Sequence, residues 1–594
     1  MPETFDTVIR NGTIVDGLRT PRFVSDIGIR DGKVAYIGRI FDPGTAEIID
    51  AQGLIVAPGF VDLHTHYDSQ VFWDPYCTIG GWHGITSNVI GNCGFSFAPC
   101  KPEHRERIMK MMERNEAVPW KAMEQGMPWD WETLPEFLDS VERTPLGVNL
   151  MSYVGIAPMI AYAMGGVEEA KKRRPTGAER EHIREMFREA LDAGACGFSL
   201  QYFGPNHSQQ DYDGTPFLTD TLHFDDVLLF AEVLREKQMG FIQILCPDLD
   251  KIEKLAEVSG RPIIYNVLAA SRDQHGMSTN AHKDTIEWLK SCNDRGLRIF
   301  ASAITSEVGH TFSLDNWNFF DGIDSWRHAL VGTVEEKIEK LSDPALRQTF
   351  REEYDRGWGP FPGASQRVFE SMGKVKKAKM FSGVEDMIIG HTNSNEYKDF
   401  TGLTVGQAAE RLGRHVIDAF LDISLSDGLK TEFETPPTKY NVNDMREVVK
   451  ADTSMPGVSD GGAHQKFSTF GAYPTTFLTE MVREHKMVDL EEAHWKLSAL
   501  PAYAAGLRDR GYLREGMPAD IVIYDFNALE LLPVEVVHDF PGGDWRRIKK
   551  ARGYRYIMVN GDVTFTDGEC TGKTPGRLLR WGSAHAEPMA IAAE

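Results

Sequence analysis

Both ends of the chain carry short apolar runs separated by turn residues, a pattern that predicts β-strands. Residues 1–57 contain the runs FDTVIRNGTIVDG, VSDIGIRDGKVAYIG and AEIIDAQGLIVAPG, and the C-terminal segment contains DIVIYDFNAL and YRYIMVNGDVTFTDGE. Both segments hold Asn-Gly or Asp-Gly dipeptides of the kind found in hairpin turns, at 11–12, 31–32, 560–561 and 567–568. We therefore expect residues 1–57 and 501–594 to pair into one small β-sandwich domain.

The middle of the chain, residues 58–500, alternates apolar runs with helical stretches, as βα units do. Helical stretches such as EREHIREMFREALDAG separate most of the candidate strands. About eight parallel strands with intervening helices predict a (β/α)8 TIM-like barrel, an α/β fold. The segment from about 306 to 385 is longer than a plain connection, so we expect an insertion near the barrel mouth. The candidate strands are GFVDLHTH, TSNVIGNCG, GVNLMSYVG, ACGFSLQY, GFIQILCP, PIIYNVLA, RIFASAIT, DMIIGHTN and PGVSDGGA.

The composition agrees with a large protein of the soluble class. The chain has 594 residues, too many for one ordinary core, so a barrel plus a smaller domain is the expected arrangement. Hydrophobic residues make up 42% and charged residues 25%, and no apolar run approaches the roughly 20 residues of a membrane span. A net charge of −23 would repel nucleic-acid phosphates. We therefore expect neither nucleic acid nor a membrane as a partner.

The N-terminus and the cysteines point to a reducing compartment. The segment MPETFD is acidic and lacks the basic and apolar regions of a secretion signal. The seven cysteines are an odd number without CxxC pairs, which fits reduced thiols or a metal ligand better than disulfides. We expect the protein to be cytoplasmic.

Two histidines one residue apart form the first candidate site. His64 and His66 follow an apolar run and the Pro58-Gly59 pair. Because residues i and i+2 of a strand point to the same face, both imidazoles can converge on one metal ion inside a barrel. The alternative is a pair of core histidines with neighbouring aspartates as partners, since histidine serves both purposes.

The surrounding motifs add a family resemblance that covers nearly the whole chain. VAPGFVDLHTH, GMPADIVIYD and VNGDVTFTDG resemble the amidohydrolase superfamily. Within it, HTHYD, HGITSNVIGNCGFSFAP, PWDWETLPEFLD and GVSDGGAH are similar to the N-acyl-D-amino-acid deacylase (D-aminoacylase) family, in its longer-chain branch. The resemblance implies a metal-dependent hydrolase.

That resemblance also implies a set of metal ligands from three segments. In the family, the HxH pair ends the first barrel strand, the cysteine of GNCG binds metal, and the aspartate of the SDG motif is both ligand and catalytic base. Carried over, these residues are His64, His66, Cys93 and Asp460. Nitrogen, sulfur and carboxylate donors together suit zinc. Taken alone, Cys93 could equally be a buried thiol and Asp460 a turn residue.

The sequence departs from the family pattern at two places. The family carries two further histidines, in segments that here read GFIQILCPD and RPIIYNVLAA. Gln243 and Asn266 stand where those histidines are expected. Amides bind zinc less well than imidazoles do, so we expect one Zn²⁺ per chain rather than two.

Four further residues are candidates for substrate binding. Tyr202 follows GFSLQ, a stretch similar to one that lines the family's substrate pocket. His391 ends the apolar run MIIG, as a barrel-mouth residue would, and His464 lies four residues after Asp460. Arg272 is the nearest basic candidate for holding a substrate carboxylate, with a surface salt bridge as the alternative.

Together these features predict zinc-dependent hydrolysis of a linear amide bond in a small-molecule substrate, as the resemblance to N-acyl-D-amino-acid deacylases implies. Zinc would activate the attacking water, and Asp460 would act as general base and then as general acid. A cyclic amide, or an aryl or natural-product amide, is an alternative substrate, because no carboxylate clamp is evident. The missing histidines leave a catalytically inactive scaffold as a further alternative. The subunit number is open, with a homo-oligomer as one option.

Overall fold

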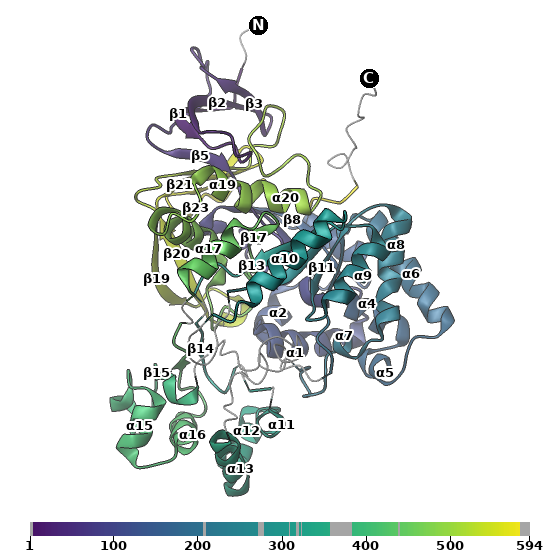
Figure 1. Cartoon of the computed structure of the whole chain (residues 1–594), viewed down its shortest axis with the longest axis vertical. Helices are drawn as coiled ribbons and strands as arrows, with labels where there is room; N and C mark the ends of the chain where they lie inside the picture. Colours follow the sequence, from purple (N-terminus) through teal and green to yellow (C-terminus); the bar gives the residue numbers. More distant parts are fainter. Residues whose placement is uncertain are drawn as a thin grey trace.

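A computed structural model describes residues 4–205, 210–270, 278–307, 309–316, 320–321, 323–356, 383–437 and 440–582. It combines a β domain made from both chain ends, a central barrel, and a helical insertion that projects at the end opposite to strands β1–β3 (Figure 1). None of the helices in these described ranges is both long enough and apolar enough to cross a membrane.

The two ends of the chain form one nine-stranded sheet, so the expected β domain from both termini is present. Its order is β23-β22-β21-β18-β5-β1-β2-β3, with β4 paired to β1. Strand β5 joins the two halves, because it pairs with β1 in parallel and with β18 antiparallel. The strands are β1 (Thr7–Ile14), β2 (Phe23–Arg30), β3 (Lys33–Gly38), β4 (Glu47–Asp50), β5 (Ile55–Pro58), β18 (Ile521–Tyr524), β21 (Tyr554–Val559), β22 (Asp562–Thr566) and β23 (Glu569–Cys570).

The Asn-Gly and Asp-Gly dipeptides occupy backbone positions that most residues avoid. Asp31, Asn560 and Asp567 have φ angles of 54°, 46° and 47° and turn the chain at β2–β3, β21–β22 and β22–β23. Asn11, with φ of 58°, lies instead where the register of β1 shifts against β2, so the hairpin turn predicted there is wrong. The dipeptide signals positive φ, which a bulge accepts as readily as a turn does.

The barrel consists of parallel strands in eight positions. A three-stranded sheet, β6-β7-β8, and a six-stranded sheet, β9-β10-β11-β12-β13-β17, meet where only Tyr153 separates β8 from β9. The circle closes between β17 and β6, where Thr65 bridges Gly461 in parallel. The (β/α)8 fold is therefore confirmed. The strands are β6 (Phe60–Asp62), β7 (Ile85–Ile90), β8 (Asn149–Ser152), β9 (Val154–Gly155), β10 (Gly197–Gln201), β11 (Phe241–Leu245), β12 (Ile263–Leu268), β13 (Ile299–Ala303) and β17 (Ser454–Pro456).

Helices cover the outside of the barrel, as α4, α6, α8, α9 and α10 show in Figure 1. Local sequence starts two of them, because Thr133 and Thr176 each form a capping box with the glutamate three residues later. The barrel helices are α1 (Arg105–Glu116), α2 (Trp120–Gly126), α3 (Leu134–Arg143), α4 (Ile156–Met164), α5 (Val167–Lys172), α6 (Gly177–Asp192), α7 (Leu218–Thr221), α8 (Phe224–Lys237), α9 (Leu249–Ser259), α10 (Ala281–Asp294), α17 (Val442–Lys450), α18 (Tyr473–Thr476), α19 (Leu490–His494) and α20 (Leu500–Ala504).

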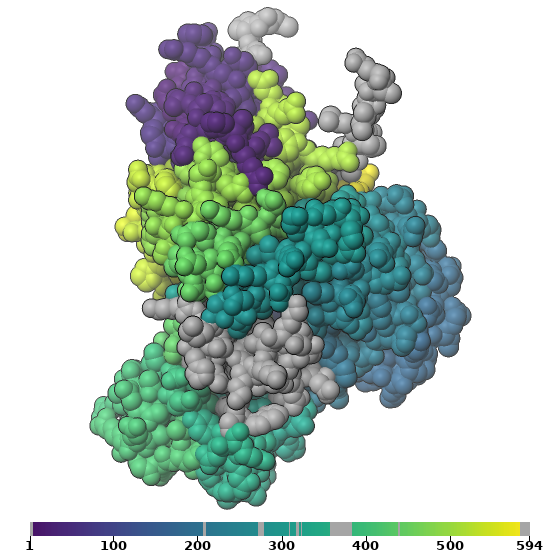
Figure 2. Space-filling view, viewed as in Figure 1, coloured from purple at the N-terminus to yellow at the C-terminus, as the bar shows by residue number. Residues whose placement is uncertain are grey.

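The insertion is larger than the sequence predicted. Because β13 pairs directly with β17, the chain between these strands lies outside the barrel sheet, and a separate hydrophobic core there continues to Phe433, beyond the expected end at 385. This core centres on Trp326, Phe350 and Phe420, and Figure 2 shows the insertion as a lobe of its own. Its elements are β14 (Thr311–Phe312), β15 (Ile388–Ile389), β16 (Phe433–Glu434), α11 (Asp324–Ala329), α12 (Val334–Ser342), α13 (Pro344–Asp355), α15 (Val405–Leu412) and α16 (Val416–Ser426).

The candidate strand DMIIGHTN belongs to this insertion and not to the barrel. Ile388 and Ile389 form β15, which pairs with β16 in a three-stranded sheet with β14. A short apolar run carries no information about which sheet it joins, and this explains the mistaken assignment.

Candidate metal centre

The four predicted metal-site residues lie where three barrel strands end. His64 and His66 follow β6, Cys93 lies in the turn after β7, and Asp460 follows β17. The backbone of this region is tied together, because the His66 N–H donates to the Gly461 carbonyl at 2.6 Å and the Ser459 hydroxyl donates to the His64 carbonyl at 3.2 Å. The carboxyl ends of barrel strands are where active sites of this architecture form.

The side chains of His64, His66 and Cys93 converge. The Cys93 Sγ lies 3.4 Å from His64 Nε2 and 3.8 Å from His66 Nε2, and the three donor atoms all lie within 4.8 Å of one another. All three residues are buried. The two-residue period of the chain therefore brings both imidazoles to one point, beside a thiol from the next strand.

Asp460 completes this group from the opposite edge of the barrel. Its Oδ1 lies 3.1 Å from His64 Nε2 and 4.0 Å from His66 Nε2. The Asp460 side chain is 23% exposed while the two imidazoles are 2% exposed, so this carboxylate is the member that faces the accessible side. Although burial raises its pKa, hydrogen bonding to His64 and the neighbouring imidazoles lower the pKa of Asp460 to about 2.

The donor atoms are spaced as a tetrahedral zinc site requires. With Zn–N of about 2.0–2.1 Å and Zn–S of about 2.3 Å, tetrahedral ligand atoms lie about 3.3–3.6 Å apart. The observed separations of 3.1–4.0 Å between Cys93 Sγ, Asp460 Oδ1 and the two Nε2 atoms bracket that range. The residues present therefore fit zinc.

The protonation states around the centre also favour a cation. Burial, and then the charges of Glu116, Asp460 and Asp68, raise the pKa of the Cys93 thiol well above its usual value. Burial and the neighbouring His64 lower the pKa of His66 to about 3, so this imidazole is neutral and ready to donate its lone pair. A thiolate at this position needs a bound cation to form.

Glu116 and His464 extend the centre on the side of His66. Glu116, the last residue of α1, has its Oε2 3.8 Å from His66 Nε2 and 3.3 Å from His464 Nε2. The sequence analysis weighed His464 only as a substrate-binding residue and missed Glu116. Nothing local distinguishes Glu116 from the other acidic residues of RERIMKMMERNE, because only the fold turns the end of α1 toward the barrel.

His310 is a second residue that the sequence analysis missed. It belongs to the insertion segment, where its backbone is held by Thr435. Burial lowers the pKa of His310 to about 3, and its imidazole lies near enough to His464 and Asp460 for their charges to act on it. The insertion therefore contributes a neutral imidazole beside the exposed edge of the centre.

Gln243 and Asn266 hold each other and the Cys93 turn. The Cys93 N–H donates to Gln243 Oε1 at 2.9 Å, and Gln243 Nε2 donates to Asn266 Oδ1 at 3.2 Å. Both amides are buried, on β11 and β12. The two positions expected to carry histidines therefore serve the backbone of the cysteine turn and one another.

The remaining predicted substrate residues lie away from these contacts. The Tyr202 hydroxyl donates to the Leu222 carbonyl at 2.9 Å, with the Lys251 ammonium 5.2 Å from its ring centre. His391 is exposed and lies in the insertion sheet, 3.2 Å from Asn393 Oδ1, instead of at a barrel strand end. Arg272 falls outside the described residues.

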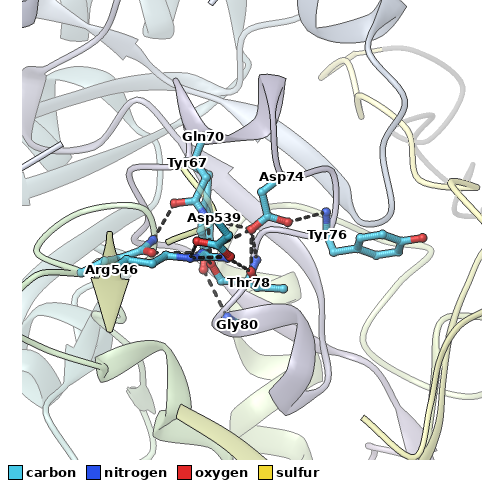
Figure 3. A network of polar contacts seen from close by, with 9 residues as sticks. Tyr67, Gln70, Asp74, Tyr76, Thr78, Gly80, Asp539 and Arg546 are labelled. Atoms are coloured by element: carbon cyan, nitrogen blue, oxygen red, sulfur yellow. Dashed lines mark hydrogen bonds and ion pairs between the residues drawn. The ribbon is translucent and has the colours of Figure 1, made fainter. Parts of the chain in front are cut away.

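The loop after His66 is anchored by a buried arginine from the C-terminal hairpin, which we call the Arg546 cluster (Figure 3). This hairpin comprises β19 (Glu530–Val537) and β20 (Arg546–Arg552). The guanidinium donates to Asp539 at 2.7 Å and to the Thr78 hydroxyl at 2.8 Å, and lies 3.5 Å from Asp74. Gln70 donates to Asp74 at 2.8 Å and to the Thr78 carbonyl at 2.7 Å. These bonds fix the loop between the HTH motif and β7.

Comparisons with known proteins agree with the motifs. The sequence profile of the amidohydrolase family matches residues 47–565. The chain is 23% identical to D-aminoacylase of Alcaligenes xylosoxydans xylosoxydans, over 97% of this chain and 98% of that protein. It is 25% identical to N-acyl-D-aspartate deacylase of the same organism, over 98% of this chain and 96% of that protein.

A crystal structure shares the fold. N-acyl-D-glutamate deacylase from Bordetella bronchiseptica, complexed with zinc and a phosphonate inhibitor, superposes with a TM-score of 0.64 at 20% identity, covering 97% of this chain and 100% of that one. The resemblance inferred from the motifs is confirmed. The chain belongs to the amidohydrolase family.

Proposed function

We propose that this protein is a zinc-dependent hydrolase that cleaves the linear amide bond of a small N-acyl compound. The observation that carries the proposal is the convergence of two imidazoles, one thiol and one carboxylate at the carboxyl ends of three barrel strands. The matching relatives, D-aminoacylase and N-acyl-D-aspartate deacylase, support the deacylase reading.

His64, His66, Cys93 and Asp460 would hold the metal. Bound zinc supplies Lewis acidity, which lowers the pKa of a coordinated water to about 7 and polarises a carbonyl. The chain itself supplies a buried frame, because the Cys93 turn is held by Gln243 and the loop after His66 is held by the Arg546 cluster. A frame of this kind keeps donor atoms in place without reorganisation.

Asp460 is the group that moves the proton. With its pKa lowered to about 2, the carboxylate is ionised at neutral pH and can accept a proton from the attacking water. The same oxygen then delivers that proton to the amide nitrogen as the C–N bond breaks. The products are a carboxylic acid and an amine, so one water is consumed and the proton count balances.

An apolar pocket beside the cysteine turn indicates the kind of acyl group. Phe95, two residues after Cys93, lines it together with side chains from α1, α4 and the segment before α7. This lining favours an apolar acyl chain over a charged one. Its apolar members include Phe95, Ile108, Met111, Ala161, Phe217 and Leu218.

A second candidate substrate is an amide without a free carboxylate, such as an aryl amide. Within the described residues, no lysine or arginine forms a hydrogen bond or ion pair with Cys93, Glu116 or Asp460. A carboxylate group of the substrate would normally be held by such a cation.

A substrate screen with chelation tests the proposal. N-acyl-D-amino acids, their L-forms and bulky aryl amides are incubated with the protein, and free amine is measured. We expect hydrolysis in at least one class, loss of activity with a strong chelator and recovery on adding zinc. Activity that survives complete zinc removal would contradict the proposal, and turnover of aryl amides alone would select the second candidate.

A further inference from the structure

Glu116 is a fully enclosed carboxylate with no cationic partner. Its side chain is 3% exposed, and its polar neighbours are the imidazoles of His66 and His464. Among the residues that the structure describes, no lysine or arginine forms an ion pair with it. A buried carboxylate is normally paired with a cation or bound to a metal.

The surroundings of Glu116 are rich in negative charge. Burial, and then the charges of Asp460 and Asp68, raise the pKa of Glu116 well above its usual value. The same three carboxyl groups raise the pKa of the Cys93 thiol. Such a cluster is stable when a divalent cation offsets its charge, and thiol, imidazole and carboxylate groups together form a ligand set for zinc.

The chain holds Glu116 in this place by both backbone and side chain. Ala117, with φ of 51°, ends α1 directly after Glu116. The His464 N–H donates to the Glu116 carbonyl at 2.6 Å, and His464 Nε2 lies 3.3 Å from Glu116 Oε2. An imidazole beside a ligating carboxylate is the arrangement that orients metal ligands in proteins.

The centre has ligand places that the barrel strands leave empty. Gln243 and Asn266 stand where histidines are expected, and their amides bind one another and the Cys93 N–H. We propose that Glu116 is a ligand of the metal centre and replaces the donors lost at those two positions, with His464 as its positioning residue. This inference rests on the proposed zinc site.

The competing explanation is a neutral acid. In that case Glu116 stays protonated and donates a hydrogen bond to an imidazole, and its role is to pack the end of α1. A glutamine has the same shape and can donate the same bond, yet its amide is a poor zinc ligand. The Glu116→Gln substitution therefore separates the two explanations.

The test measures zinc affinity by chelator competition for the wild type, Glu116→Gln and Glu113→Gln. Glu113 is the matched control, because it lies one turn earlier on α1 and accepts a hydrogen bond from the Trp120 N–H at 3.0 Å. For Glu116→Gln we expect affinity to fall more than a hundredfold, beyond the roughly 10- to 100-fold loss typical of an outer contact. The control should stay within about threefold of the wild type, the margin of a side chain outside the ligand sphere.

A second readout reports the ligands directly. In the cobalt-substituted protein, the visible absorption bands should change position and intensity in Glu116→Gln and stay unchanged in Glu113→Gln. Equal zinc affinity and equal cobalt spectra in the wild type and Glu116→Gln would overturn the inference while leaving the zinc site intact. Absence of zinc binding in the wild type would instead overturn the proposed function, and this inference with it.

If Glu116→Gln does not fold, as judged by circular dichroism, the wild type supplies the answer. Crystals of the zinc-loaded protein are measured at the zinc absorption edge. A Glu116 carboxylate oxygen within about 2.5 Å of a zinc peak would support ligation. A distance beyond about 4 Å would overturn it.

Discussion

The metal centre and the Arg546 cluster are two buried polar groups attached to the same loop, and they balance charge differently. In the Arg546 cluster, a guanidinium meets the carboxylates of Asp74 and Asp539 (Figure 3). In the metal centre, Asp460 and Glu116 meet imidazoles, and no arginine or lysine of the described segments pairs with them.

This difference separates a structural cluster from a binding site. Where the chain supplies its own cation, the charges are satisfied on folding, and the result is a rigid loop. Where buried carboxylates, imidazoles and a thiol gather without a cation, the balance is completed from outside the chain. The predictions below contrast the two clusters, beginning with the largest expected effect.

Removing the proton acceptor from the metal centre should have the largest effect. Asp460→Asn keeps the shape of the side chain and removes its basicity, so we expect turnover to fall about 10³- to 10⁴-fold. The control is Asp539→Asn in the Arg546 cluster, which should stay close to wild-type turnover because Asp539 contacts only that cluster. Steady-state kinetics with circular dichroism checks both. Near-normal turnover in Asp460→Asn would reject Asp460 as the base.

Removing the cation from the Arg546 cluster should affect stability and not metal binding. Arg546→Met leaves the Asp74 carboxylate without its ion pair, so we expect unfolding free energy to fall by about 3–5 kcal/mol. On the same strand, Arg552 pairs with Glu530 at the surface, and Arg552→Met should cost less than about 1 kcal/mol. Denaturant titration measures both, and unchanged stability in Arg546→Met would break the contrast.

Gln243 connects the two descriptions, because it supports the centre without the geometry of a ligand. Gln243→Leu removes the acceptor of the Cys93 N–H, so we expect stability to fall by about 1–3 kcal/mol. Zinc affinity should fall by about tenfold, since the cysteine turn loses its support. Complete loss of zinc in this variant would instead make Gln243 a ligand.

Zinc affinity should depend on pH through Cys93. Burial raises the pKa of this thiol, so it is protonated at pH 7 without metal, and zinc must displace one proton. Affinity should therefore fall about tenfold for each unit that the pH is lowered. His66, with a pKa of about 3, adds nothing to this slope above pH 4. Chelator competition at pH 6, 7 and 8 measures the slope, and a flat profile would contradict the assignment.

The fold was predictable where the sequence carries a repeated local signal. Eight of the nine candidate strands lie in the barrel, and the dipeptides at 31–32, 560–561 and 567–568 mark turns. The insertion boundary and the place of His391 were not predictable, because a short apolar run such as MIIG joins a small sheet as readily as a barrel.

The same limit applies to the site. His64 and His66 are visible as a pair because a strand has a two-residue period. Cys93 and Asp460 needed the family motifs, since neither is distinctive alone. Glu116 carried no signal, because its approach to His66 depends on where α1 ends and on the His464 segment that meets it.

The most direct test of the zinc site is the metal content of protein purified without added metal. Elemental analysis is made on the wild type, Cys93→Ala and Cys100→Ala, two buried thiols of which only Cys93 lies between the imidazoles. We expect at least about one zinc per chain in the wild type and in Cys100→Ala, and little or none in Cys93→Ala. A wild type without zinc, or a Cys93→Ala variant that retains it, would contradict the account.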